Sequence, residues 1–172
     1  MSARFPHEPR GNEGQAAASA RFEDQDRTLR ALHQVERVAG GPRGDEAAWH
    51  RSMLDALAVL QEAMAEEQAN ADRPESLLSN IAHTQPRLRS RTRGTRAQYQ
   101  QLRETVAELR RDIAAIGALD VDLNDLRRRV ARLASALRYQ RARESDVIYE
   151  AYYDIFQTDI DSGIRDAGSP QA

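Results

Sequence analysis

The sequence predicts an all-α protein, an up-down four-helix bundle with an additional N-terminal amphipathic helix. Two long stretches carry apolar residues in steps that alternate between four and three, as in the seam of a helical bundle. No segment shows sustained alternation with a period of two, so no sheet is expected. Only a few residues after Gly117 join the two long stretches, which therefore form antiparallel neighbours.

The N-terminal part divides into two segments. Residues 1–22 contain prolines and glycines but few large apolar residues, so we expect this segment to be disordered. Residues 23–44 are expected to hold a short helix and a linker. The helix, Glu23 to Ala39, should act as a lid on the main bundle, and Gly40 and Gly41 should end it. Its apolar residues at helical spacing are Leu29, Leu32, Val35 and Val38.

The bundle itself is expected to span residues 45–161, followed by a flexible tail over 162–172. Asp45 is a suitable N-cap for its first helix, which should run to about Asn70 on a stripe of Met53, Leu57, Leu60 and Met64. Pro74 restarts the chain in a short helix that ends near His83.

Two long helices complete the predicted bundle. The first begins near Pro86 and ends at Gly117, with a seam of Leu88, Thr92, Thr95, Tyr99, Leu102, Val106, Leu109, Ile113 and Ile116. The second is expected to be capped by Asp120, with a seam of Leu123, Leu126, Val130, Leu133, Leu137, Gln140, Glu144, Val147, Ala151 and Ile155.

Composition excludes several classes of function. The 172 residues include no cysteine and no lysine, which removes disulfides, cysteine-rich metal sites, Schiff-base lysines and the P-loop lysine. No nucleophile elbow and no glycine-rich phosphate loop occurs, so we expect no enzymatic activity. No apolar run approaches the roughly 20 residues that span a bilayer, and the first 20 residues lack a signal-peptide core, so a cytoplasmic protein is expected.

Arginine is unevenly distributed. Residues 87–143 carry 15 arginines against 6 acids, between two acidic segments. Neutralisation within the fold is the simpler interpretation. The alternative is an arginine-rich nucleic-acid-binding face, although no aromatic platform is interleaved with the arginines. The residues concerned would be Arg87, Arg89, Arg91, Arg93, Arg96 and Arg127 to Arg129.

Polar residues interrupt both long seams at one height. In an antiparallel pair that turns after Ile116, Tyr99 faces the level of Leu137 to Gln140, and Glu144 lies one turn further. The predicted polar compartment contains Thr92, Thr95, Tyr99, Gln140 and Glu144, and Glu67 joins it if the first bundle helix ends on that side. A buried carboxylate needs compensation. Glu144 could pair with Arg93, Arg96 or the Tyr99 hydroxyl, could bind a metal, or could lie in water.

The four histidines do not form a metal-binding pattern. They are His7, His33, His50 and His83, and no two have the spacing that places both on one helix face. Glu-x-x-His, typical of carboxylate di-iron bundles, is absent. His50 lies near the inner stripe of its helix, where it is expected to be a partly buried histidine near a helix start or a candidate metal ligand.

Residues from about Asp45 to Asp161 resemble the hemerythrin-like (HHE-type) helical bundles, most closely a divergent actinobacterial branch. The stretches concerned are ESLLSNIAHTQPRLRSRTRGTRAQYQQLRETVAEL and LASALRYQRARESDVIYEAYYDIFQTDI. The resemblance implies a di-iron centre held by histidines and carboxylates, and a role in oxygen or nitric-oxide sensing or iron handling. The family's final-helix His and Glu fall on Gln140 and Glu144, its third-helix His on Tyr99, and its first-helix ligand on His50 or Glu67.

The leading hypothesis is therefore a non-enzymatic bundle with a vestigial metal site and no cofactor, acting in regulation or scaffolding. Its partner would be an unknown protein or a second copy. The possible interaction face consists of four aromatic residues, Tyr149, Tyr152, Tyr153 and Phe156. The alternative is that these residues cover the end of the bundle. The alternatives are an iron-binding protein that uses the polar compartment and the nucleic-acid-binding module.

Overall fold

The computed structural model describes residues 10–42, 44–117 and 120–166, with side chains described over 16–42, 44–117 and 120–152. Over these residues the chain is all-helical and contains no strand, as predicted. The helices are α1 (Arg10–Gly40), α2 (Glu46–Ala71), α3 (Leu77–Thr84), the short 3-10 segment η1 (Pro86–Leu88), α4 (Arg89–Ala115) and α5 (Leu123–Asp166).

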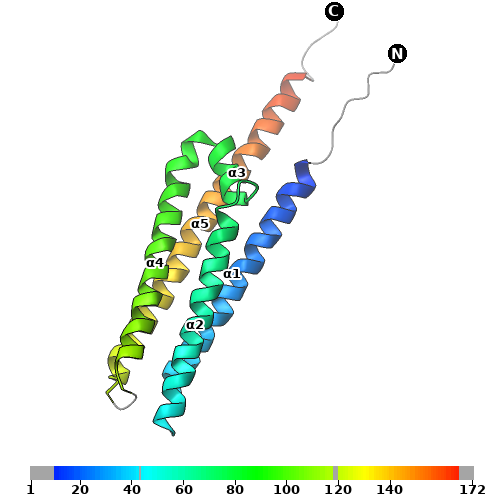
Figure 1. Cartoon of the computed structure of the whole chain (residues 1–172). Helices are drawn as coiled ribbons and strands as arrows, with labels where there is room; N and C mark the ends of the chain where they lie inside the picture. Colours follow the sequence, from blue (N-terminus) through cyan, green and yellow to red (C-terminus); the bar gives the residue numbers. More distant parts are fainter. Residues whose placement is uncertain (1–9, 43, 118–119, 167–172) are drawn as a thin grey trace, which may run out of the picture.

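Four long helices pack side by side, and consecutive ones run in opposite directions (Figure 1). The packed pairs are α1 with α2, α2 with α4, α4 with α5, and α5 with α1, so the four close into a ring around a common interior. The short helix α3 lies at the end of the ring where α1 begins and α5 ends, and it contacts all four long helices.

The role of α1 corrects the prediction for the N-terminal part. The helix begins at Arg10, within the segment 1–22 that was expected to be disordered, and it is a full member of the ring rather than a lid. Its buried positions explain the difference, because Arg21, Asp24 and Thr28 continue the helical spacing of Leu32 and Val35 toward the N-terminus. Because these three buried residues are polar, this part of the sequence resembled a solvent-exposed segment. At the other end, α5 continues to Asp166, into the expected tail.

Side-chain caps account for the starts of α2, α3 and α5. The side chain of Asp45 accepts from the Ala48 amide at 3.1 Å, as expected for the N-cap of α2. Ser76 caps α3 by accepting from the Ser79 amide at 3.2 Å. The cap of α5 is Asp122, not the predicted Asp120, since its carboxylate accepts from the Asn124 and Asp125 amides at 2.9 and 3.1 Å. These amide donors lower the pKa of Asp122.

Two apolar clusters fill the interior. The larger one contains the predicted stripe of α2, the seam of α4 from Tyr99 to Ile113, the seam of α5 from Leu126 to Leu137, and Leu32 and Val35 of α1. The smaller one lies under α3 and consists of Leu77, Ile81, Leu88, Val147 and Ala151. Ile116, predicted at the end of the α4 seam, is instead 40% exposed, because α4 ends at Ala115 and Ile116 has extended backbone.

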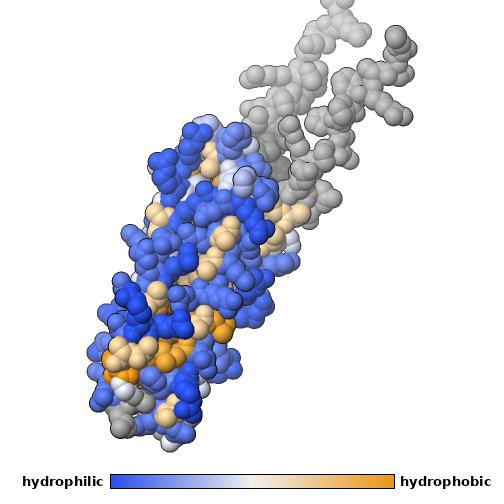
Figure 2. All heavy atoms as spheres, in the orientation of Figure 1, coloured by the Kyte–Doolittle hydropathy of each residue, from blue (hydrophilic) through white to orange (hydrophobic). Residues whose placement is uncertain are grey.

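Hydrophilic side chains cover most of the face shown in Figure 2, and apolar side chains gather toward the end of the bundle that carries the α1–α2 and α4–α5 connections. None of the described helices has the length and apolar character needed to cross a membrane.

Candidate functional site

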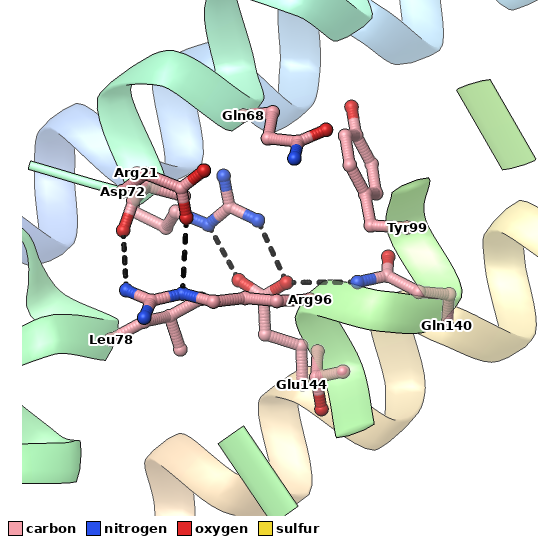
Figure 3. A pocket seen from close by; sticks show the side chains of 10 residues that line it. Arg21, Gln68, Asp72, Leu78, Arg96, Tyr99, Gln140 and Glu144 are labelled. Atoms are coloured by element: carbon pink, nitrogen blue, oxygen red, sulfur yellow. Dashed lines mark hydrogen bonds and ion pairs between the residues drawn. The ribbon is translucent and has the colours of Figure 1, made fainter. Parts of the chain in front are cut away.

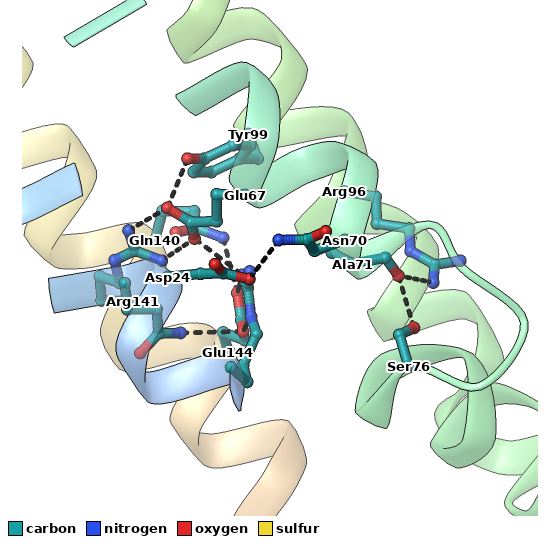
Figure 4. A network of polar contacts seen from close by, with 12 residues as sticks. Asp24, Glu67, Asn70, Ala71, Ser76, Arg96, Tyr99, Gln140, Arg141 and Glu144 are labelled. Atoms are coloured by element: carbon teal, nitrogen blue, oxygen red, sulfur yellow. Dashed lines mark hydrogen bonds and ion pairs between the residues drawn. The ribbon is translucent and has the colours of Figure 1, made fainter. Parts of the chain in front are cut away.

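A layer of polar side chains separates the two apolar clusters. Each of the four long helices contributes buried polar side chains to it, and Figure 4 shows part of the resulting network. The charged members of the layer are three carboxylates, Asp24 of α1, Glu67 of α2 and Glu144 of α5, and two guanidinium groups, Arg21 of α1 and Arg141 of α5. Glu67 and Glu144 pair with the two guanidinium groups, so these four charges balance one another. Asp24 accepts a hydrogen bond from the Asn70 amide at 2.9 Å and lies 3.8 Å from Arg27.

Glu144 is the most deeply buried charge, with 0% of its surface exposed. Arg21 holds it in a bidentate pair, with Nε donating to Oε1 at 2.5 Å and Nη2 donating to Oε2 at 2.7 Å (Figure 3). The Gln25 amide donates to Oε1 at 3.0 Å, and the Gln140 amide donates to Oε2 at 3.1 Å. Both oxygens of Glu144 therefore accept two hydrogen bonds, which compensates for the loss of water.

Glu67 is 1% exposed and is equally well compensated. Arg141 donates to both of its oxygens, with Nη2 lying 2.6 Å from Oε2. Oε2 also accepts from the hydroxyls of Thr28 and Tyr99, each at 2.6 Å. Nη2 of Arg21 lies 3.0 Å from Oε1, so Arg21 bridges Glu67 and Glu144. The Arg141 guanidinium also lies 5.8 Å from the centre of the Tyr99 ring, within range of a cation–π interaction.

The pKa shifts in the layer follow from this geometry. Burial alone would raise the pKa of Glu67, but the hydrogen bonds and charge of Arg141, with Arg21 and Thr28, outweigh burial and lower it. Burial would lower the pKa of Arg21, but Glu144 and Glu67 raise it above its ordinary value. The pKa of Tyr99 is raised by burial and then by the negative charge of Glu67. Tyr99 therefore remains a neutral phenol that donates its hydrogen to Glu67.

The structure brings four of the five predicted metal-site residues together. Glu67, Tyr99, Gln140 and Glu144 all lie in the layer, at the height that helix arithmetic predicted. His50 does not join them. It lies 17 positions before Glu67 on α2, or about 25 Å along the axis, and its Nε2 lies 2.9 Å from the carbonyl oxygen of Ile113.

None of the three partners predicted for Glu144 forms a hydrogen bond with it among those described above. Arg93 is exposed, Arg96 donates to the Ala71 carbonyl and the Ser79 hydroxyl, and the Tyr99 hydroxyl donates to Glu67 instead. Thr92 and Thr95 are buried as expected, but their hydroxyls donate to carbonyls of their own helix, at Leu88 and Arg91.

Sequence reasoning missed the residues that compensate the two carboxylates. Arg21, Gln25 and Thr28 lie on α1, and a signal for two of them was present, since Arg21 and Thr28 precede Val35 at intervals of seven. Arg141 carried no such signal. It lies one position beyond the α5 seam, and its long side chain turns back into the layer.

The donor set of the layer does not fit a metal ion. Each carboxylate oxygen of Glu67 and Glu144 already accepts from arginine, and two guanidinium groups would lie beside any bound cation. Tyr99 is held in its neutral form, which is a poor ligand, and none of the described histidines lies in the layer. Over the described residues, no group of three histidine or acidic side chains is arranged to hold a metal ion.

The other two candidate surfaces are described only in part. Tyr149 is 71% exposed, whereas Tyr152 packs against the smaller apolar cluster, and the side chains of Tyr153 and Phe156 lie outside the described ones. Among the arginines considered for nucleic acid, several form ion pairs with acids: Arg87 and Arg91 with Glu150, Arg96 with Asp72, Arg128 with Asp125, and Arg129 with Asp112.

Comparison with known proteins assigns no family to this arrangement. The chain matches no protein-family model, no curated protein and no solved structure.

Proposed function

We propose that this chain is a non-enzymatic helical bundle that acts in regulation or scaffolding, and that its buried polar layer fixes the packing of the helices. The resemblance to hemerythrin-like bundles supports a vestigial interpretation of the site. In this proposal, arginine has taken over the compensation of carboxylates that a metal provides in that family.

One observation carries the proposal. Arg21 lies between Glu67 and Glu144 and contacts both, in the place where a cation shared by the two carboxylates would have to lie. A guanidinium group is planar and offers five donors in fixed directions, so it can satisfy two carboxylates from different helices at once. The result is a permanent internal link between α1, α2 and α5.

Such a layer has a structural use. Buried ionic groups add little stability compared with apolar packing, but they penalise any arrangement that leaves one of them unpaired. A shift of α1 by one turn would remove Arg21 from Glu144 and would put an alanine, Ala17 or Ala18, or else Asp24 or Gln25, in its place. The layer therefore favours one register of α1 against α2 and α5, as is expected for a bundle that must present a fixed surface.

Metal content tests the vestigial site. The full chain would be expressed without a tag, supplied with iron, purified without oxygen and examined by elemental analysis and absorption spectroscopy. We expect no stoichiometric iron and no charge-transfer band. The matched comparison is the double variant Arg21→Ala and Arg141→Ala, which frees both carboxylates. Stoichiometric iron with a charge-transfer band in the unaltered protein would contradict the proposal and favour an iron-binding role.

We propose that a second copy or another protein binds at the exposed ring of Tyr149 on α5. Tyr149 has the largest exposed fraction among the large apolar side chains described, at 71%, and Tyr139, ten positions earlier, is 60% exposed. Sedimentation over a range of concentrations should show self-association that Tyr149→Ser weakens. Tyr139→Ser is the control, since it removes a similar exposed ring from the same helix. A monomer at every concentration would exclude self-association and leave only a different protein as the partner.

A further inference from the structure

We infer that the outer face of α5 is a binding site for single-stranded nucleic acid. The inference goes beyond the proposed function and does not depend on it. Four exposed side chains form the site, which we call the α5 row: Arg128, Arg132, Tyr139 and Arg143. They follow one another at intervals of four, seven and four positions, so they lie on one side of the helix, over about 22 Å of its axis.

The row lies in a strongly basic stretch of the chain. From Arg127 to Arg143 the sequence contains seven arginines and no acidic residue, and Asp125 and Asp146 lie beyond its two ends. The whole chain has a net charge of -2, but at about 0.1 M salt charges are largely screened beyond about 10 Å. A polyanion that approaches α5 therefore meets arginine first.

The three arginines of the row keep their guanidinium groups available. Arg132 is exposed and forms no ion pair among the described residues. Arg128 has 69% of its side chain exposed, and its ion pair with Asp125, at 3.6 Å, is of the surface kind that contributes little to stability. Arg143 is exposed and lies 5.9 Å from the centre of the Tyr139 ring. A phosphate group can therefore bind each of them without breaking a buried contact.

Tyr139 selects nucleic acid among the anions that arginine attracts. Its ring is 60% exposed, with Arg132 about 10 Å before it along the helix axis and Arg143 about 6 Å after it. A nucleobase stacks on such a ring while the phosphates on either side of the base bind the arginines. An acidic peptide would use the charges alone. The arginines that the sequence suggested for nucleic acid had no aromatic ring among them, whereas the α5 row has one between its arginines.

The site favours a single strand over a duplex. The bases of a duplex are paired and stacked on one another, so their faces are closed to a side chain on the surface of a helix. Proteins that bind a single strand combine a basic track for the phosphates with aromatic rings for the unstacked bases. The α5 row has both components in one line.

Fluorescence anisotropy with a labelled oligodeoxythymidine of about 20 nucleotides, longer than the row needs, tests the inference on the full chain. Three contacts to phosphate predict that the logarithm of the binding constant falls against the logarithm of the salt concentration with a slope of about -2, since each contact contributes about 0.7. In the variant Arg132→Gln with Arg143→Gln, the slope should be smaller in magnitude by about 1.4. Tyr139→Leu should weaken binding about tenfold and leave the slope unchanged, because it removes stacking but no charge.

The matched control is Arg37→Gln with Arg111→Gln, which removes two exposed arginines from α1 and α4 and should leave both the affinity and the slope unchanged. All the substituted positions are exposed, and circular dichroism checks that each variant remains helical. The inference is wrong if the unaltered chain does not bind the oligonucleotide at about 50 mM salt, or if the variants of the row bind as tightly as the control. Equal binding of polyglutamate would overturn it in favour of an acidic protein, and tighter binding of a duplex would overturn the choice of a single strand.

Discussion

Replacing Arg21 by methionine should destabilise the protein strongly, because the change leaves Glu144 buried without a counter-charge. Arg21 is 6% exposed and Glu144 is 0% exposed, and they share hydrogen bonds of 2.5 and 2.7 Å. Breaking a buried ion pair from one side costs about 3–5 kcal/mol. Since Glu144 keeps amide donors from Gln25 and Gln140, and Glu67 keeps Arg141, we expect about 3 kcal/mol, the lower end of that range.

Denaturant unfolding, followed by the circular dichroism of the helices, measures this loss of stability. If the slope of the unfolding free energy against denaturant concentration is the same in the variant and the unaltered protein, the two unfold in the same way. The double variant Arg21→Met and Glu144→Met removes both charges and keeps apolar volume in the layer. It should be more stable than Arg21→Met alone, because no unpaired carboxylate remains. The reasoning is refuted if the double variant is no more stable than the single one, or if Arg21→Met costs less than about 1 kcal/mol, the value typical of exposed ion pairs.

Three further changes test other parts of the structure. Because the pKa of Glu67 is lowered in the fold, its ionised form stabilises the protein at pH values above the ordinary pKa of 4.5, and this stability is lost as the pH falls through the lowered pKa. The free energy of unfolding, measured across the acid range, should therefore fall less with pH in Glu67→Gln than in the unaltered protein. Tyr99→Phe removes a hydrogen bond of 2.6 Å to a buried carboxylate and should cost about 1.5–3 kcal/mol, whereas Tyr139→Phe, at an exposed site, should cost nothing measurable. Gly94→Ala should raise stability by about 1 kcal/mol, since the position is helical and a Cβ there would meet no atom within 4 Å; a decrease in the unfolding midpoint would contradict this.

The interior seams of α2, α4 and α5 were predictable because apolar spacing directly reports which face of a helix is buried. Met53, Leu57, Leu60 and Met64 are all buried, as predicted. The same arithmetic correctly placed Tyr99 and Gln140 at one height, since two antiparallel helices joined by a short turn have a fixed register.

Prediction failed for the buried polar residues of α1. Arg21 and Thr28 lie on the buried stripe of α1, but a polar residue at a seam position looks the same in sequence as a residue on an exposed surface. This is why the first ring helix was taken for a lid preceded by a disordered segment. Extending the seven-residue interval from Val35 toward the N-terminus reaches both residues, so the signal was present but had no apolar residue to mark it.

The sequence by itself determined that the chain is helical, where most of its helices begin and end, and that two carboxylates and several polar groups enter the bundle interior. Only the tertiary structure decided which of its arginines compensate them. Local periodicity determines the face of a helix on which a residue lies, but an arginine side chain spans the distance to a neighbouring helix and can turn in more than one direction. The pairing of Arg21 with Glu144, and of Arg141 with Glu67, therefore depends on the packing of α1 and α5 against the other helices, which no local pattern encodes.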